Sequence, residues 1–252
     1  MLSGYIAASV DASRVGTVPF DYVAFDRVFP DDVYEDMLAA MPAASDYRPM
    51  SGRATENVLP DGTHTRVKLD LFPENIRNLA PEKQNIWKVV GAALRSVQLK
   101  RALVRKLAPG LSRRFGPEFE SVGMYPIPIL TRDITGYQIL PHADTHWKGI
   151  TAQFYLPRDE SAAHTGTFFH ELLPGRVVPK SVQMKLVPNS GYAFAVDTDI
   201  IHSADTVGPE VKTRDSILLT YFVDAGALRY MRNRVKRIGN FLVNEFRPGG
   251  LR

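Results

Sequence analysis

The feature that most constrains the fold of this chain is a series of short apolar segments in its C-terminal half, separated by turns. Four of them read as strands: residues 137–140, 149–156, 192–196 and 214–223. Pro141 follows the first strand, and the sequence Pro-Asn-Ser-Gly before the third is typical of a tight turn. This half of the chain is therefore predicted to be mainly β.

Two candidate metal ligands follow the first of these strands. His142 and Asp144 are two positions apart. In an extended segment such residues project to the same side, so both side chains can reach one metal ion. A polar turn without a metal would also account for this triplet when it is taken alone.

Two further polar residues stand in apolar surroundings. His202 follows two isoleucines, and by itself it reads as a buried core histidine. Arg214 opens an apolar strand in which residues 214 and 216 share a face, and a guanidinium inside a barrel is costly unless an anion pairs with it. Two imidazoles and one carboxylate are the protein ligands of the facial triad that holds Fe(II) and leaves positions open for O2 and substrates.

The order of these residues resembles that of the Fe(II)/2-oxoglutarate-dependent dioxygenases, in the branch similar to prolyl 4-hydroxylases. The resemblance covers about residues 125–223. It rests on an ordered set of motifs: His142-x-Asp144, Ile150-Thr151, Tyr155-Leu156, Gly166-Thr-Phe-Phe169, Val187-Pro-Asn-Ser-Gly191, His202 and Arg214-x-Ser216. The chain departs from the family pattern at Thr167, which replaces a second glycine and leaves the register of that strand open.

The resemblance implies a mainly β fold with flanking helices, a double-stranded β-helix or jelly-roll, cupin-like barrel. It also implies that His142, Asp144 and His202 bind Fe(II) and form the catalytic centre, with 2-oxoglutarate and O2 as cosubstrates. Arg214 and Ser216 are expected to bind the distal carboxylate of 2-oxoglutarate, with Tyr155 and Thr151 as further donors. The implied reaction is hydroxylation of an unactivated C–H bond, with release of succinate and CO2.

A small metabolite is the expected substrate, such as an amino acid derivative or a biosynthetic intermediate, because no appended peptide- or nucleic-acid-binding module is evident. Candidates for contact with the substrate are Arg66, Arg132 and Arg158, which could hold a carboxylate, and His146 and Trp147. Two alternatives stay open: a hydroxylase of a protein- or carrier-linked residue, and a metal-binding barrel of cupin type that is not an oxygenase. Binding of 2-oxoglutarate separates the last of these from the others.

Length and composition agree with a single domain over residues 1–252, since a chain of this length can bury one sizeable core. The chain has no cysteine, which excludes disulfides, thiolate-ligated haem and cysteine-held iron–sulfur clusters. Any metal must therefore be held by nitrogen and oxygen ligands. The net charge of +4 is modest and no nucleic-acid recognition motif is present, so no nucleic-acid partner is expected.

The flanking segments carry expectations of their own. Helices are expected at about residues 30–42 and 81–108, and the polar segment 45–65 is either a surface connection or a lid over the barrel. Residues 228–246 read as a basic amphipathic helix that packs on the barrel or makes a homodimer or peripheral membrane contact. The first residues lack a basic signal region and no apolar run reaches membrane-spanning length, so the expected location is cytoplasmic.

Overall fold

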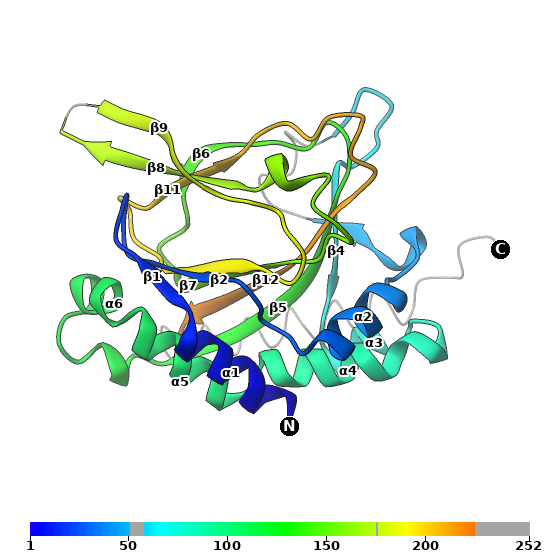
Figure 1. The fold of residues 1–252 in the computed structure, drawn as a ribbon, viewed down its shortest axis with the longest axis horizontal. Coiled ribbons are helices and arrows are strands. Elements are labelled where there is room, and N and C mark those ends of the chain that lie inside the picture. Colours follow the sequence, from blue (N-terminus) through cyan, green and yellow to red (C-terminus); the bar gives the residue numbers. More distant parts are fainter. Residues whose placement is uncertain (51–57, 175, 225–252) are drawn as a thin grey trace.

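Two antiparallel β-sheets face each other in the computed structural model, which describes residues 1–50, 58–174 and 176–224 (Figure 1). Within these residues the larger sheet has eight strands and the smaller sheet has four. The strands of the larger sheet lie in the order β1 (Arg14–Gly16), β2 (Tyr22–Phe25), β10 (Gly191–Ala195), β7 (Lys148–Tyr155), β12 (Arg214–Val223), β5 (Met124–Asp133), β4 (Arg66–Asp70) and β3 (Arg48–Pro49). The strands of the smaller sheet lie in the order β6 (Ile139–Ala143), β11 (Ile201–Ala204), β8 (Thr167–Leu173) and β9 (Arg176–Met184).

The strands from β5 to β12 confirm the predicted double-stranded β-helix. Strands β5, β7, β10 and β12 belong to the larger sheet, and β6, β8, β9 and β11 belong to the smaller sheet, so the chain passes repeatedly from one sheet to the other. The last strand, β12, lies between β7 and β5 in the larger sheet. Strands β1 to β4 extend the larger sheet on both sides.

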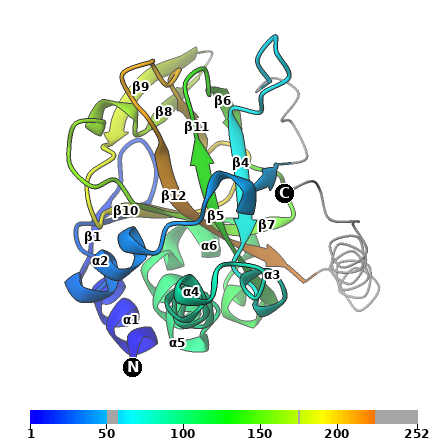
Figure 2. The same ribbon diagram turned by 90° about the vertical axis from the view of Figure 1, so that its right-hand side faces the viewer.

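Helices cover the outer face of the larger sheet (Figures 1 and 2). They are α1 (Leu2–Ala12), α2 (Asp31–Ala39), α3 (Pro73–Ile76), α4 (Pro81–Leu94), α5 (Val97–Lys106) and α6 (Ala108–Phe115). The first hydrophobic core lies at this interface, where Trp87 and Leu103 from the helices join Phe154 and Ile217 from the strands, all of them fully buried. Burial of these apolar surfaces fixes the sheet on its helical layer.

A second hydrophobic core lies between the two sheets. Tyr192 and Phe194 of β10 and Phe169 of β8 belong to it. The alternate residues of β10, Ala193 and Ala195, belong to the first core instead. Burial of both faces of β10 explains why residues 192–196 read as a continuous apolar run in the sequence.

The turn before β10 binds this strand to the N-terminal half of the chain. Asn189 has φ 56°, a left-handed conformation that asparagine tolerates better than most residues. Its Oδ1 accepts hydrogen bonds from the backbone N–H groups of Val28 (3.1 Å) and Phe29 (2.9 Å), and its Nδ2 donates to the carbonyl of Phe29 (2.8 Å). A Cβ atom at Gly191 would collide with the backbone carbonyl of Gln153, so this position requires glycine.

The structure departs from the expected helices and strands at specific residues. The helical region expected at 81–108 is divided into α4 and α5, because Ser96 caps a new helix by accepting a hydrogen bond from the N–H of Leu99 at 3.2 Å. Strand β6 continues through Pro141 instead of ending before it, which a strand at the edge of a sheet tolerates. The helices α1 and α6 were not among the predicted elements.

Two expected features fall wholly or partly outside the described residues. The segment 45–65 begins within the short 3-10 helix η1 (Ala44–Asp46) and then contains β3, while residues 51–57 are not described. The helix expected at 228–246 also lies outside the described residues, so its packing, dimer and membrane roles stay predictions. No helix in the described ranges is both long enough and apolar enough to span a membrane.

Candidate metal centre and buried arginine cluster

Three of the predicted site residues meet between the smaller sheet and β7. His142 of β6, His202 of β11 and Asp144, which directly follows β6, offer ligand atoms that all lie within 4.8 Å of one another. The antiparallel register of β6 and β11 places the two histidines directly opposite each other, with ring centroids 4.4 Å apart. His146 is exposed and does not belong to this group.

The imidazole of His202 is buried against Phe194, whose ring centroid is 5.1 Å away. Burial lowers the pKa of His202 to about 4, and this effect outweighs the opposing attraction of Asp144. The ring is therefore neutral at pH 7, which is the form that binds metals. A backbone hydrogen bond with Ile200 opposes this shift in pKa and is the smallest of these effects.

His142 is oriented by its own strand. Its Nδ1 lies 2.9 Å from the carbonyl oxygen of Leu140, so we assign the ring proton to Nδ1 as the donor in this hydrogen bond. That tautomer carries a lone pair on Nε2. A hydrogen bond from one ring nitrogen to a backbone carbonyl is the usual way in which proteins orient a metal-binding histidine.

Both carboxylate oxygens of Asp144 have partners. The ammonium group of Lys148 donates to Oδ1 at 2.6 Å, and the hydroxyl of Thr151 donates to Oδ2 at 2.6 Å. Burial raises the pKa of Asp144, but Lys148, His202 and the two hydrogen bonds lower it further, and the net shift is downward. Asp144 is thus ionised at neutral pH. Thr151, which the resemblance places among the 2-oxoglutarate donors, makes this hydrogen bond to the carboxylate of Asp144.

These three residues fit a divalent transition metal such as Fe(II). Two imidazole nitrogens and one carboxylate oxygen match the facial-triad ligand set, and the chain offers no thiolate that would favour a softer metal. The neutral His202 and the ionised Asp144 need lose no proton to bind the ion at pH 7. Sequence spacing had suggested this group, and the structure brings all three residues together.

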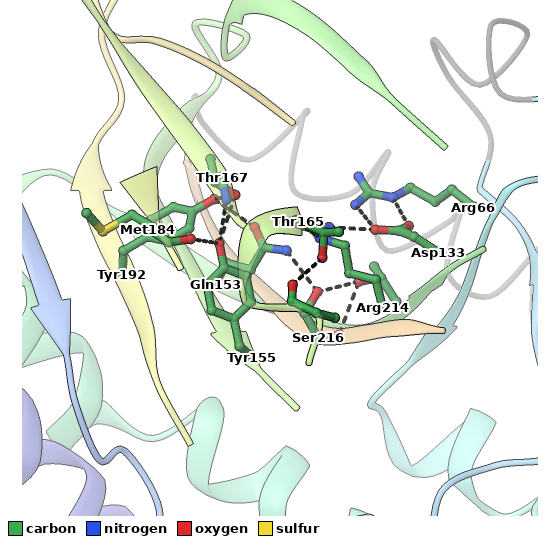
Figure 3. A network of polar contacts seen from close by, with 12 residues as sticks. Arg66, Asp133, Gln153, Tyr155, Thr165, Thr167, Met184, Tyr192, Arg214 and Ser216 are labelled. Carbon is green, nitrogen blue, oxygen red and sulfur yellow. Dashed lines mark hydrogen bonds and ion pairs between the residues drawn. The ribbon is translucent and has the colours of Figure 1, made fainter. Parts of the chain in front are cut away.

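Arg214 lies in the interior at the start of β12, with 1% of its surface exposed (Figure 3). Its Nη1 donates to Oδ2 of Asp133 at 2.6 Å, and its Nε donates to the backbone carbonyl of Thr165 at 2.7 Å. The resemblance implied an anion from outside the chain as the partner of Arg214, whereas in the structure Asp133 of the same chain pairs with it. The available signal was a carboxylate at the end of the apolar segment 124–133, but its pairing with Arg214 depends on a β5–β12 register that the sequence does not display.

A second arginine shares the same carboxylate. Arg66 of β4 donates from Nε to Oδ1 of Asp133 at 2.6 Å and from Nη2 to Oδ2 at 2.8 Å. Its guanidinium carbon lies 4.1 Å from the ring centroid of Tyr137. Burial lowers the pKa values of Arg66 and Arg214, but the charge of Asp133 raises both further, so each remains a cation. We refer to Arg66, Asp133, Tyr137 and Arg214 as the arginine cluster.

The remaining candidates for 2-oxoglutarate binding belong to a buried chain of hydrogen bonds beside this cluster (Figure 3). Its members, in order, are Thr131, Ser216, Gln153, Tyr192, Thr167 and Tyr155. The hydroxyl of Ser216 accepts from Nε2 of Gln153 at 2.8 Å, and the hydroxyl of Tyr155 donates to Oγ1 of Thr167 at 2.9 Å. Sequence reasoning did not identify Gln153 or Tyr192 as members of this network.

Thr167 resolves the register that the sequence left open. It opens β8 opposite Ala204 of β11, and its Oγ1 receives hydrogen bonds from the hydroxyls of Tyr155 (2.9 Å) and Tyr192 (3.0 Å). Its backbone N–H donates to the hydroxyl of Tyr155 at 3.0 Å. Thr167 thus links two residues of the larger sheet to the smaller sheet.

The other predicted substrate-contact residues are placed differently. Arg132 pairs with Asp215 at 2.7 Å on the face of β5 opposite to Asp133. Arg158 donates to the backbone carbonyl of Leu38 at 2.9 Å. The structure brings neither arginine into the arginine cluster. His146 and Trp147 lie exposed just after Asp144, with ring centroids 4.9 Å apart.

Comparison with known proteins finds similarity in structure only. No protein-family model matches the sequence, and no curated protein matches it. A prolyl-4-hydroxylase from Pseudomonas putida aligns with a TM-score of 0.52 and 16% identity, over 86% of this chain and 98% of that chain. AviO1 from Streptomyces viridochromogenes Tue57 aligns with a TM-score of 0.48 and 16% identity, over 88% of this chain and 96% of that chain.

An oxidoreductase of the 2OG-Fe(II) oxygenase family from Burkholderia pseudomallei aligns with a TM-score of 0.47 and 13% identity, over 87% of this chain and 89% of that chain. The alignment with the Pseudomonas putida prolyl-4-hydroxylase shows that this chain has the same fold, as the resemblance of its motifs implied.

Proposed function

We propose that this protein is an Fe(II)- and 2-oxoglutarate-dependent dioxygenase that hydroxylates an unactivated C–H bond of a small metabolite. The observation that carries the proposal is the convergence of His142, Asp144 and His202, whose ligand atoms lie within 4.8 Å of one another on a double-stranded β-helix. A buried cationic cluster on the facing sheet supports it, because 2-oxoglutarate presents a carboxylate at the end remote from the metal.

In this proposal the protein supplies geometry and charge. His142, Asp144 and His202 would hold Fe(II), which with 2-oxoglutarate and O2 supplies the oxidising chemistry that yields succinate, CO2 and a hydroxylated product. Lys148 and Thr151 keep Asp144 ionised and oriented. Arg214 would bind the distal carboxylate of 2-oxoglutarate, with Tyr155 and Ser216 as neighbouring hydroxyl groups.

The proposal of a small metabolite as substrate is based on the domain organisation of the described residues. The described residues form the barrel and its helical layer, and no separate peptide- or carrier-binding module is apparent in them. The P. putida structure is described as a prolyl-4-hydroxylase, so hydroxylation of a protein-linked residue is the alternative within the same chemistry. A substrate library that contains free metabolites and peptides, scored by succinate release, would distinguish the two.

Binding of 2-oxoglutarate tests the proposal directly. Calorimetric titration of metal-loaded protein under anaerobic conditions should show binding, and Arg214→Ala should abolish it at a cost of roughly 2–5 kcal/mol while leaving metal affinity nearly unchanged. Asp144→Gly should weaken Fe(II) binding, because it removes the anionic ligand. A metal-loaded wild-type protein that does not bind 2-oxoglutarate would instead favour a non-oxygenase barrel.

A further inference from the structure

The arginine cluster carries more positive than negative charge. Among the described residues, two guanidinium groups, those of Arg66 and Arg214, meet the single carboxylate of Asp133. All three groups are shielded from water: the side chains of Asp133 and Arg214 are 0% and 1% exposed, and that of Arg66 is 16% exposed. A net charge of +1 in such a place is costly unless an anion joins it.

Aromatic rings compensate part of this excess. The guanidinium carbons of Arg66 and Arg214 lie 4.1 Å and 5.9 Å from the ring centroid of Tyr137, and that of Arg214 lies 5.8 Å from the ring centroid of Tyr155. A cation over an aromatic face is stabilised only modestly, by less than a buried charge requires. The cluster is therefore suited to take up one further negative charge.

Arg66 and Asp133 have separable roles in this arrangement. Asp133 orients Arg214 by accepting from Nη1, while the carbonyl of Thr165 accepts from Nε. A carboxylate that orients Arg214 also neutralises it, and an Asp133–Arg214 pair alone would present no net charge to an incoming anion. Arg66 offsets that loss because it occupies both oxygens of Asp133 through two hydrogen bonds.

We propose that Arg66 sets the net positive charge of the arginine cluster, so that Asp133 can hold Arg214 in place without cancelling its attraction for the distal carboxylate of 2-oxoglutarate. Arg66 is a positioning and charge-setting residue that acts through Asp133 and need not touch the cosubstrate. The inference rests on the proposed function and adds to it a residue from β4, a strand outside the β5–β12 barrel.

The test measures binding to protein loaded with Mn(II), under anaerobic conditions, so that no turnover intervenes. The two probes are 2-oxoglutarate and 2-oxopentanoate, which share a five-carbon 2-oxo acid skeleton but differ in the distal carboxylate. Arg66→Met should weaken 2-oxoglutarate binding roughly 10- to 100-fold, as expected for removal of a charge in a partly desolvated site. Binding of 2-oxopentanoate should be unchanged, and Arg66→Lys should retain most of the affinity for 2-oxoglutarate.

A charge-balanced double variant separates a charge effect from a packing effect. Arg66→Met with Asp133→Asn restores the net charge of +1 and should recover most of the affinity for 2-oxoglutarate that Arg66→Met loses. The matched control is Arg105→Met, which breaks an arginine–aspartate pair between Arg105 of α5 and Asp11 of α1, on the helical layer, and should leave binding of both probes unchanged.

Several outcomes would overturn the inference. Arg66 does not act through charge if Arg66→Met leaves 2-oxoglutarate affinity unchanged or lowers the affinity for both probes equally. The same conclusion follows if the double variant binds 2-oxoglutarate as weakly as Arg66→Met does. Arg214→Ala distinguishes this failure from failure of the proposed function. If Arg214→Ala no longer binds 2-oxoglutarate and Arg66→Met still does with full affinity, only the role proposed for Arg66 is refuted. If the wild-type protein binds no 2-oxoglutarate, both the proposed function and the role of Arg66 are refuted.

Discussion

Lys148 and Asp144 form an ion pair of 2.6 Å at the edge of the candidate metal centre. The side chain of Asp144 is 7% exposed and that of Lys148 is 20% exposed, so solvent screens the pair only in part. The ammonium group carries charge of the same sign as a metal ion and occupies one oxygen of the carboxylate that the ion would use. Lys148 therefore both holds Asp144 ionised and competes with the metal for it.

Opposite effects on metal affinity are expected from the two partners of Asp144. Lys148→Met should strengthen Mn(II) or Co(II) binding by about tenfold, because it removes a like charge near the ion. Thr151→Val should weaken binding by roughly 10- to 100-fold, as is typical when a hydrogen bond that orients a metal ligand is lost. Calorimetric metal titration of both variants gives the comparison. Weaker binding in Lys148→Met would show that its orienting role outweighs its repulsion.

The stability of the metal-free protein should depend on pH through His202. Burial lowers the folded-state pKa of His202 to about 4 from an unperturbed value of 6.5, so between these values the unfolded chain binds more protons than the folded chain. The stabilising contribution is complete above pH 6.5 and is lost as pH falls toward 4. The free energy of unfolding should decrease by about 2 kcal/mol from pH 7 to pH 5 on this account.

Urea unfolding at several pH values, with a chelator present, measures this effect. His202→Gln removes the titrating ring and should flatten the profile between pH 7 and pH 5 relative to the wild type. Asp144 affects stability at lower pH than His202 does, because the pKa of Asp144 lies below the usual 3.8. The stabilising contribution of Asp144 is lost only as pH falls below that value. An unchanged slope in His202→Gln would assign the pH dependence to other groups.

Thr167→Val should destabilise the protein by about 1–3 kcal/mol. The substitution preserves the shape of the side chain but removes the oxygen that accepts hydrogen bonds from the hydroxyls of Tyr155 and Tyr192, both of which are buried. Urea unfolding supplies the measurement. Thr206→Val is the matched control, because the hydroxyl of Thr206 makes an exposed hydrogen bond to Gln138 at 3.1 Å, and its loss should change stability by less than about 0.5 kcal/mol. Equal effects of the two substitutions would count against the linking role of Thr167.

Asn189→Ala should cost more than either threonine substitution, about 2–4 kcal/mol. The side chain of Asn189 makes three hydrogen bonds to the backbone of Val28 and Phe29, and alanine would remove all three in a left-handed turn. The N–H of Val28 would keep the backbone carbonyl of residue 189 as an acceptor at 3.0 Å, whereas the groups of Phe29 would lose their partner. Asn189→Gly keeps the backbone conformation accessible and isolates the loss of the side-chain bonds. Thermal or urea unfolding of both variants separates the two contributions, and a neutral Asn189→Ala would refute the role assigned to this turn.

The sequence predicts the parts of this structure that local patterns encode. Strand β12 was expected at residues 214–223 and is observed there, because most of its residues after Ser216 are apolar and no turn residue interrupts the run. The grouping of His142, Asp144 and His202 was also expected from the sequence, and the structure brings the three residues together, with Asp144 directly after β6 and His202 in β11. The fold class followed from motifs in a fixed order.

The sequence did not predict which residues pair across distant strands. Asp133 meets Arg66 and Arg214 because β4, β5 and β12 align in one register, with partners 67 and 81 positions away along the chain. Thr151 was expected beside 2-oxoglutarate, but its side chain is within hydrogen-bond distance of Asp144, seven positions earlier. In both cases the residue type was informative, while its partner was set by tertiary structure.

The central position of β12 has a consequence for how the protein is made. This strand fills the space between β5 and β7, and Val223 at its end pairs with Met124 at the start of β5. During synthesis, β5 and β7 emerge from the ribosome before β12, with about a hundred residues or fewer between them and β12. Until β12 arrives, the open edges of these two strands can pair with other chains. The nascent chain therefore passes through an aggregation-prone interval that ends only when β12 is released, and a chain that terminates before β12 cannot close the barrel.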